Sequence, residues 1–199
     1  MKKGKQLWLL AGGNGVGKST FYETRLQPKG LPFINADIIA RQLFPNDPEE
    51  HSYDAAIVAT ELRNQCLADG KSFCFETVFS HPTKIDFVAD AKTMGYEIIL
   101  VFIHLESNQL NQARISQRVS EGGHNVPVDK VISRIPRTLR YIRKTLPLCD
   151  QVYVLNNSSF ENPFEHLATL RNGVLDYCVN VLPEWAIELL QDYRVDDLS

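Results

Sequence analysis

Residues 12–19 have the sequence Gly-Gly-Asn-Gly-Val-Gly-Lys-Ser and fit the phosphate-loop pattern G-x-x-x-x-G-K-[ST]. The glycines let the backbone turn tightly, so that several N–H groups point at phosphate oxygens, and the start of a following helix adds a favourable dipole. In this chemistry Lys18 contacts the β- and γ-phosphates, the Ser19 hydroxyl binds Mg²⁺, and Thr20 offers a hydroxyl to the α-phosphate. The residues expected to hold the nucleotide are Gly12, Gly13, Asn14, Gly15, Val16, Gly17, Lys18, Ser19 and Thr20.

A carboxylate follows the second short apolar segment, in the sequence Asn35-Ala36-Asp37. Ligands of open α/β sheets gather at the carboxyl ends of the strands, so Asp37 is placed to face the γ-phosphate. A base at this point can orient an acceptor hydroxyl and take its proton. The alternative is that Asp37 only caps a helix that starts at Ile38, which aspartate does well.

Glu76 and Thr77 follow the apolar segment 73–75. Glu76 can assist Mg²⁺ through water, as a Walker B acid does. Alternatively, it can contact the acceptor, as Thr77 can. An acid that ends a strand for purely structural reasons is the alternative. We expect both residues to contribute to the substrate-binding part of the site.

Arginines are concentrated between residues 107 and 146, the segment expected to form a helical lid. Arg114 and Arg118 are four residues apart and share a helix face. The pair Gly122-Gly123 then precedes His124, a candidate substrate contact, and Arg134. The arginines of such a lid neutralise charge on the transferring phosphoryl group, and the closed lid excludes water. Arg118 and Arg134 are the candidates for the arginines that neutralise this charge. A solvated helix face is the alternative, and it is favoured for Arg140 and Arg143.

Hydrophobic periodicity predicts the elements that must position these residues. The expected strands are 7–11, 33–35, 72–75, 97–104 and 151–155, and the expected helices are 18–27, 36–44, 54–68, 82–93, 107–120 and 128–146. Pro136 lies inside the last of these helices, and proline costs ~3 kcal/mol in a helix interior, so a kink or a restart is expected there. A hairpin around 170–175 and a closing helix over 183–193 complete the chain.

Strands and helices alternate almost throughout, which predicts an α/β fold. The motif narrows this to the three-layer P-loop NTPase fold, with a mostly parallel sheet, helices on both faces and a helical lid. A chain of 199 residues can bury about 70% of its unfolded surface, so we expect one domain over 1–199, with the least certain signal in the tail 160–199.

Composition excludes several classes of protein. The chain is 44% hydrophobic and 23% charged with a net charge of -3, which excludes disordered and collagen-like chains and disfavours nucleic acid as a partner. No segment approaches the ~20 apolar residues of a membrane helix. The four cysteines form no metal-binding or disulfide pattern, so free thiols and a cytoplasmic location are expected.

Taken in order, the motifs resemble those of the zeta toxin family and its branch of predicted ABC-type ATPases. The resemblance covers roughly residues 5–158. The motifs are the phosphate loop, Ile34-Asn35-Ala36-Asp37, Phe75-Glu76-Thr77, Arg118-Val119 with Gly122-Gly123-His124 and Pro127, and Arg134.

The resemblance implies an ATP- and Mg²⁺-dependent kinase that phosphorylates a small molecule, and well-known members act on the 3′ hydroxyl of UDP-N-acetylglucosamine under the control of an antitoxin protein. It implies that Asp37 is the general base, that Glu76 and Thr77 contact the acceptor, and that Arg118 and Arg134 serve the lid, with Arg137 as the alternative to Arg134 because Pro136 lies between them. A nucleotide-dependent switch or ATPase whose output is a partner interaction is the second hypothesis. A polynucleotide hydroxyl as acceptor is a third, and the net charge disfavours it.

Overall fold

The structure is a computed structural model, which describes residues 4–120 and 127–193. Its centre is a seven-stranded sheet with the order β2-β3-β1-β4-β5-β6-β7. The strands are β1 (Gln6–Ala11), β2 (Phe33–Ile34), β3 (Phe73–Thr77), β4 (Glu97–His104), β5 (Gln151–Asn156), β6 (Glu165–Arg171) and β7 (Val174–Cys178). The helices are α1 (Lys18–Phe21), α2 (Ala36–Leu43), α3 (Ser52–Ala68), α4 (Thr83–Thr93), α5 (Asn108–Ser120), α6 (Val128–Thr145) and α7 (Glu184–Leu190).

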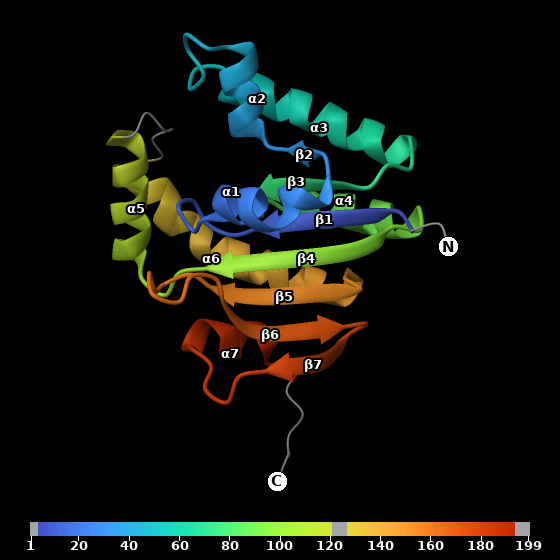
Figure 1. The fold of residues 1–199 in the computed structure, drawn as a ribbon, viewed down its shortest axis with the longest axis vertical. Coiled ribbons are helices and arrows are strands. Elements are labelled where there is room, and N and C mark those ends of the chain that lie inside the picture. Colours follow the sequence, from blue (N-terminus) through green and yellow to red (C-terminus); the bar gives the residue numbers. More distant parts are fainter. Residues whose placement is uncertain (1–3, 121–126, 194–199) are drawn as a thin grey trace.

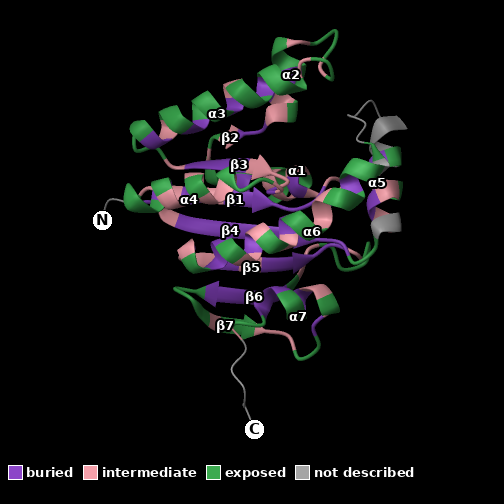
Figure 2. Ribbon diagram, turned by 180° about the vertical axis from the view of Figure 1, so that it is seen from behind, coloured by how far each residue is buried: buried purple, intermediate pink, exposed green. Residues whose placement is uncertain are grey.

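Helices lie on both faces of this sheet. Helix α1 lies in front of the sheet in Figure 1, whereas α4, α6 and α7 lie on the opposite face, which Figure 2 shows from behind. Helices α2 and α3 stand beyond the β2 edge, and α5 lies at the carboxyl ends of the parallel strands. This arrangement leaves the carboxyl edge of the sheet free to carry a binding site.

The first five strands of the order pair in parallel, and β6 and β7 add to β5 in antiparallel fashion. Figure 2 shows that the central strands are buried. Strand β4 illustrates why: its residues from Ile98 to His104 are all buried, as expected for an apolar strand covered on both faces. The predicted α/β P-loop fold with a mostly parallel sheet is therefore confirmed.

Most predicted elements are present within a few residues of their expected bounds. The predicted helix 18–27 differs, because α1 widens into a π-helical turn over Tyr22–Leu26 and ends in a 3₁₀ turn over Gln27–Lys29. In this widened turn the Tyr22 ring stacks on Phe33 at 3.8 Å between centroids, and its hydroxyl donates to the Leu31 carbonyl. Local packing has thus overridden regular helix geometry.

Of the kink or restart expected at Pro136, the restart is wrong, because α6 continues as one helix through this residue. Contacts beyond the proline hold it in place. The Thr138 hydroxyl donates to the Val78 carbonyl at 2.9 Å, and Ile142 is fully buried. The predicted hairpin is confirmed, with Asn172 at φ 50 and Gly173 at φ 77 joining β6 to β7.

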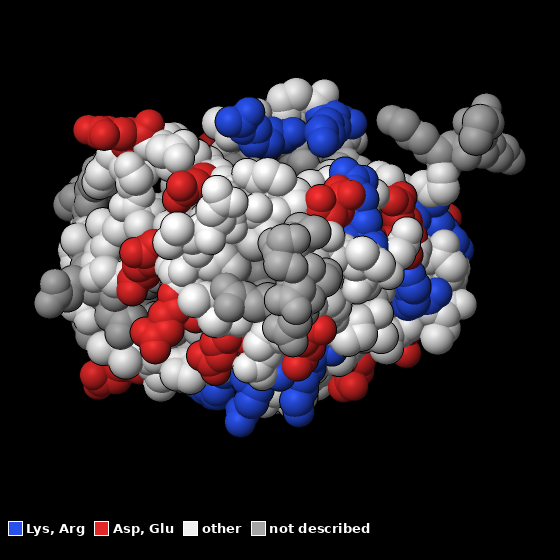
Figure 3. Space-filling model, turned by 90° about the horizontal axis from the view of Figure 1, so that it is seen from below, with Lys and Arg blue, Asp and Glu red and all other residues white. Residues whose placement is uncertain are grey.

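Charged residues and cysteines are distributed over the chain as follows. Figure 3 shows acidic and basic side chains interspersed on the face seen from below. In the described part of the chain, no helix is long and apolar enough to cross a bilayer. All four cysteines are free thiols, as predicted, and burial raises the pKa of Cys149 to about 12.

His104 ends β4 and is buried against aromatic rings. Its ring lies 4.6 Å from that of Trp185 and 5.8 Å from that of Phe102, between centroids, and only 6% of the residue is exposed. This burial lowers the pKa of His104 to about 4, so the imidazole is neutral in the folded protein at neutral pH.

The His104 pKa predicts a pH-dependent stability. Between pH ~6.5, the ordinary value for unfolded histidine, and pH ~4, the unfolded chain binds a proton that the folded protein does not, so stability falls by about 3 kcal/mol as the pH drops. Urea denaturation of wild type and His104→Gln at about pH 7.5 and about pH 4.5 measures this. The variant should lose less stability on acidification, and equal losses would contradict the assignment.

Candidate functional site

The phosphate loop connects β1 to α1 at the carboxyl edge of the sheet. The ammonium group of Lys18 donates to the carbonyls of Gly12 at 3.0 Å and Gly13 at 2.8 Å, and this residue is only 6% exposed. Gly17, at φ 95, precedes α1, and no side chain caps the helix. The first-turn N–H groups of α1 are thus left without a capping side chain, as an anion site requires.

Close contacts require glycine at several loop positions, of which Gly15 and Gly17 show what surrounds the loop. A Cβ at Gly15, where φ is 77, would lie 3.1 Å from both the Asn111 carbonyl oxygen and Ile115 Cγ1 of α5. A Cβ at Gly17 would lie 2.6 Å from Asn157 Nδ2. The loop is therefore enclosed by α5 on one side and by the segment after β5 on the other.

Glu76, at the end of β3, connects the parts of the site. One carboxylate oxygen accepts from the Ser19 hydroxyl at 2.8 Å and from the Asn35 amide at 2.7 Å, and the other lies 3.5 Å from Lys18 Nζ. Strand β3 pairs directly with β1, so Glu76 lies beside Leu10, two positions before the first loop residue, Gly12. The structure thus brings Glu76 to the Ser19 and Lys18 end of the site.

Asn35, rather than Asp37, caps α2. The Asn35 side-chain oxygen accepts from the backbone N–H groups of Asp37 at 2.8 Å and Ile38 at 3.1 Å, and the helix begins at Ala36. The alternative that Asp37 merely caps a helix starting at Ile38 is therefore wrong. The carboxylate of Asp37 is left free of any role in the cap.

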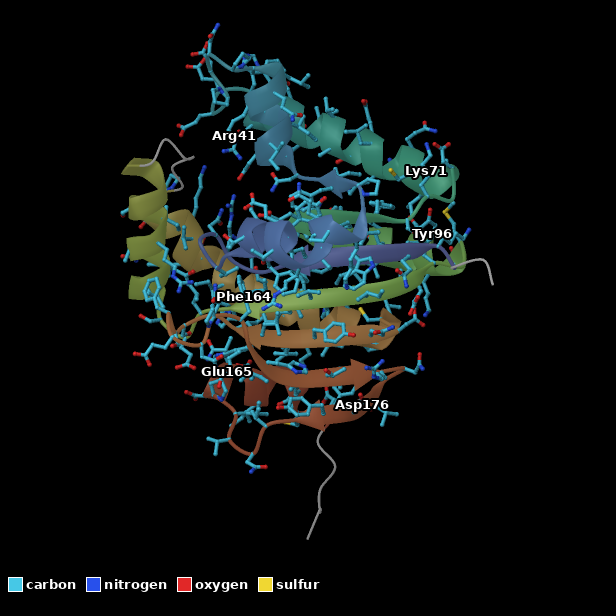
Figure 4. The ribbon with its side chains drawn as sticks, in the orientation of Figure 1. Arg41, Lys71, Tyr96, Phe164, Glu165 and Asp176 are labelled. Atoms are coloured by element: carbon cyan, nitrogen blue, oxygen red, sulfur yellow. The ribbon has the colours of Figure 1, made fainter. Side chains whose placement is uncertain are left out.

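The loop, Glu76 and α2 surround one cavity of about 610 Å³. Asp37 lines it together with Arg41, Glu49 and Ser52, all from the segment that carries α2 and α3. Figure 4 places Arg41 on one side of this region and Phe164 on the other. The remaining lining residues are Gly15, Gly17, Lys18, Ser19, Thr20, Glu23, Asn35, Ala40, Pro48, Glu76, Arg114, Asn157, Ser159, Phe160, Pro163 and Phe164.

The arginines expected to serve a lid differ in their contacts. Arg134 Nη1 of α6 donates to the Asn14 side-chain oxygen at 3.5 Å, whereas Arg137 donates to Ser133 of its own helix. Arg134 is thus the arginine of this pair that reaches the phosphate loop. Arg118 lies in α5, and its side chain and all of His124 lie outside the described residues.

Thr77 does not line the cavity, although it was predicted to contact the acceptor. Its hydroxyl accepts from the Phe79 N–H at 3.0 Å, beside the positive φ of 60 at Phe79. Its carbonyl accepts from the Gly12 N–H at 3.3 Å. Both contacts fix the backbone between β3 and the phosphate loop, so the structure indicates a supporting position.

Several cavity residues were not expected from the sequence. Asn157 donates to the Val16 carbonyl at 2.9 Å and accepts from the Phe164 N–H at 3.1 Å, which ties the phosphate loop to the segment after β5. Arg114 lies over the Phe160 ring at 5.0 Å. These contacts join residues far apart in the chain, which sequence patterns do not reveal.

The donor set suits Mg²⁺ held jointly by the protein and a nucleotide. The Ser19 hydroxyl and the Glu76 carboxylate are adjacent hard oxygen donors. Among the described residues no group of three His, Cys, Asp or Glu side chains could hold a metal. Mg²⁺ commonly takes only one or two protein ligands beside substrate phosphates, so this set fits the ion.

The cap assignment predicts how α2 responds to substitution. Asn35→Ala removes the cap and should cost about 1 kcal/mol of unfolding free energy, whereas Asn35→Ser keeps a capping oxygen and should recover most of that loss. Both variants lose the hydrogen bond to Glu76, so the difference between them reports the cap alone. Urea denaturation measures it, and equal destabilisation would show that the cap contributes nothing.

Several solved structures have a fold similar to that of this chain. A candidate kinase of Chloroflexus aurantiacus has 18% identity and a TM-score of 0.61, over 80% of this chain and 91% of its own. A structure of AvrRxo1-ORF1:-ORF2 with ATP has 18% identity and a TM-score of 0.69, over 100% of this chain and 66% of its own. The PezAT toxin-antitoxin system of Streptococcus pneumoniae has 14% identity and a TM-score of 0.61, over 100% and 81%. At these identities the likeness concerns the fold.

Sequence comparison gives the family. An uncharacterized protein of Haemophilus influenzae is 31% identical over 134 residues, which are 64% of this chain and 95% of that protein. Residues 7–140, which include the phosphate loop, Asp37, Glu76 and Arg134, match the AAA_33 family of AAA domains. The chain therefore belongs to this AAA domain family.

Proposed function

We propose that this protein is an ATP-dependent phosphotransferase that moves the γ-phosphate of ATP to a hydroxyl group of a small molecule. The observation that carries the proposal is the position of Asp37 in the same cavity as Lys18 and Ser19. Its carboxylate makes no hydrogen bond within the described part of the chain, because Asn35 has taken the capping role. A free carboxylate that shares a cavity with a phosphate loop suits a general base.

In the proposed reaction the acceptor hydroxyl gives its proton to Asp37 as its oxygen forms a bond to the γ-phosphorus. The bond between that phosphorus and the oxygen bridging to the β-phosphate breaks, and ADP leaves with the electron pair. Lys18 stabilises the phosphate oxygens, and Arg134 is placed beside the loop to do the same. When bound between Ser19 and Glu76, Mg²⁺ would neutralise charge on the β- and γ-phosphates.

The two ends of the cavity suit different parts of the substrates. Arg114 and Phe160 form one wall, where the ring and the guanidinium offer flat surfaces to a nucleotide base. Asp37 and Arg41 form the other wall, beyond the phosphate loop. We place the nucleoside of ATP at the first wall and the acceptor at the second.

A nucleotide-sugar is the acceptor we favour, with UDP-N-acetylglucosamine as the first compound to test. The support is the resemblance of the motifs to zeta toxins and the shared fold with the PezAT toxin-antitoxin system. An antitoxin protein as partner is proposed on the same ground. Arg118 and His124 keep their proposed roles in the lid, and Glu76 is proposed to serve the metal more directly than the acceptor.

Transfer of label tests the function directly. The purified chain is incubated with Mg²⁺, γ-labelled ATP and a panel of nucleotide-sugars, and the label is followed by chromatography. Label on a sugar is the expected result and identifies the acceptor. Label released only as inorganic phosphate would favour the second hypothesis, in which hydrolysis drives a partner interaction.

Asp37→Asn tests the proposed base. The amide cannot accept the hydroxyl proton, so transfer should fall by roughly 10²-fold or more. ATP affinity should stay close to wild type, because the phosphate loop is unchanged. Single-turnover transfer and equilibrium ATP binding measure the two effects, and an unchanged transfer rate would remove Asp37 from the role of base.

Lys18→Ala tests the phosphate loop. The variant loses the cation that meets the β- and γ-phosphates, so ATP binding and transfer should both weaken. Calorimetric titration with ATP and the same transfer assay report the two losses. Lys144→Ala, at an exposed position of α6, is a matched control that should leave both unchanged. Full activity in Lys18→Ala would exclude the loop from catalysis.

A further inference from the structure

Arg63 of α3 is a buried cation without an acidic partner. Only 7% of the residue is exposed, and within the described part of the chain it forms no salt bridge. Its guanidinium lies over the rings of Phe75 at 4.9 Å and Phe87 at 5.4 Å, and Nη2 donates to the Thr60 hydroxyl at 2.8 Å. Its Nε has no hydrogen-bond partner. Buried guanidinium groups are normally paired, so this arrangement calls for an explanation.

A second cation lies near the first. Lys84, in the first turn of α4, is half-buried and has no carboxylate partner among the described residues. Burial and the neighbouring charge of Arg63 lower the pKa of Lys84 to about 8. The ammonium group is therefore still mostly protonated at neutral pH. Lys84 is three residues before Phe87 on α4, so the two share a helix face, and the Arg63 guanidinium of α3 lies over the Phe87 ring. Two positive charges are thus carried by the adjoining faces of α3 and α4.

The pair is separate from the cavity that holds the phosphate loop. Neither Arg63 nor Lys84 lines that cavity. Successive residues of a strand point to opposite faces of a sheet, so Glu76 and its neighbour Phe75 face different sides of β3. Glu76 faces the cavity, whereas Phe75 lies under Arg63. The cations therefore lie on the other face of the same strand.

Ring contacts compensate only part of the cost of this burial. A cation over an aromatic ring gains ~0.5–2 kcal/mol, whereas a buried charge left without a counter-charge costs several kcal/mol. A bound anion would remove the deficit. Two unpaired cations match a charge of two, which points to a dianion rather than to a single carboxylate.

We propose that Arg63 and Lys84 form a binding site for a small dianionic oxyanion of the phosphate or sulfate type, between α3 and α4 and independent of the nucleotide cavity. The guanidinium donates from Nε, which has no other partner, the ammonium group supplies the second charge, and the Phe75 and Phe87 rings hold the guanidinium in place. Anion binding at this site does not depend on whether the chain transfers phosphate.

Residue-resolved NMR on the full chain separates this site from the phosphate loop, which also binds anions. Sulfate is added at constant ionic strength, with chloride as the balancing salt, and the signals of Arg63 Nε–H and the Lys84 side chain are followed. A saturable shift of both signals is expected with sulfate and with phosphate. A shift that is absent, or that chloride reproduces, would overturn the proposal.

Substitution of Lys84 tests the second cation without disturbing the aromatic contacts of Arg63. In Lys84→Met, sulfate affinity at Arg63 should fall about tenfold or more, the loss expected for one charge-assisted hydrogen bond. Lys144→Met is the matched control and should titrate as the wild type does. Equal affinity in Lys84→Met and wild type would overturn the two-cation site.

Two further measurements test the charge of the ligand and the role of Arg63. Acetate should bind more weakly than sulfate, and equal or tighter binding of acetate would overturn the dianion assignment. Arg63→Met replaces the guanidinium with an apolar side chain that can still pack against the rings, so the variant should fold. Sulfate should raise its thermal stability less than that of the wild type, because only the phosphate loop is left to bind the anion. A sulfate effect of the same size in both proteins would show that Arg63 has only a structural role.

Discussion

One carboxylate holds the candidate site together. Glu76 accepts from Ser19 and Asn35 and lies beside Lys18, so the phosphate loop, the end of β3 and the start of α2 all meet at its two oxygens. An acid at this point has no apolar substitute, because removing it would leave the Ser19 hydroxyl and the Asn35 amide without an acceptor and Lys18 without its counter-charge. The positions of the Ser19 hydroxyl, the proposed metal ligand, and of Asp37, the proposed base, are thereby set relative to each other.

Asn35 transmits this constraint to α2. Its amide nitrogen donates to Glu76, and its oxygen receives the first N–H groups of the helix. Both ends of one short side chain are therefore used, and the helix that carries Asp37 is oriented from the phosphate end of the cavity. Rigid placement of this kind reduces the reorganisation that a transfer reaction would otherwise need.

The other side of the loop is fixed by packing rather than by charge. Helix α5 approaches so closely that a Cβ at Gly15 would be crowded, and Asn157 ties the Val16 carbonyl to the segment after β5. The phosphate loop is thus held by a carboxylate network toward β3 and by close contacts toward α5 and β5. Its conformation does not depend on the glycines alone.

The sequence was most informative where contacts are local. Residues 12–20 form one continuous turn, so their pattern alone located the loop, and the rule that strand ends share one edge brought Glu76 toward Ser19 across 57 positions. Contacts set by one side chain's orientation could not be predicted. Thr77 turns toward Phe79 instead of the cavity, and Asn35 takes the capping role that was one option for Asp37. Asn157 reaches Val16 across 141 positions, and no pattern of residue types encodes that encounter.

The short strand β2 has a consequence for how such a site can diversify. It pairs with β3 through only Phe33 and Ile34, yet it is the element that leads into α2 and α3, which form the wall with Asp37, Arg41 and Ser52. The phosphate-binding side of the cavity belongs to the central sheet, whereas the wall that carries Asp37 is attached at its margin. Insertions or exchanges in the segment 38–70, beyond Asp37, can therefore change the size and charge of the molecule admitted while the phosphate loop and the proposed base stay in place, so a single core can serve many acceptors.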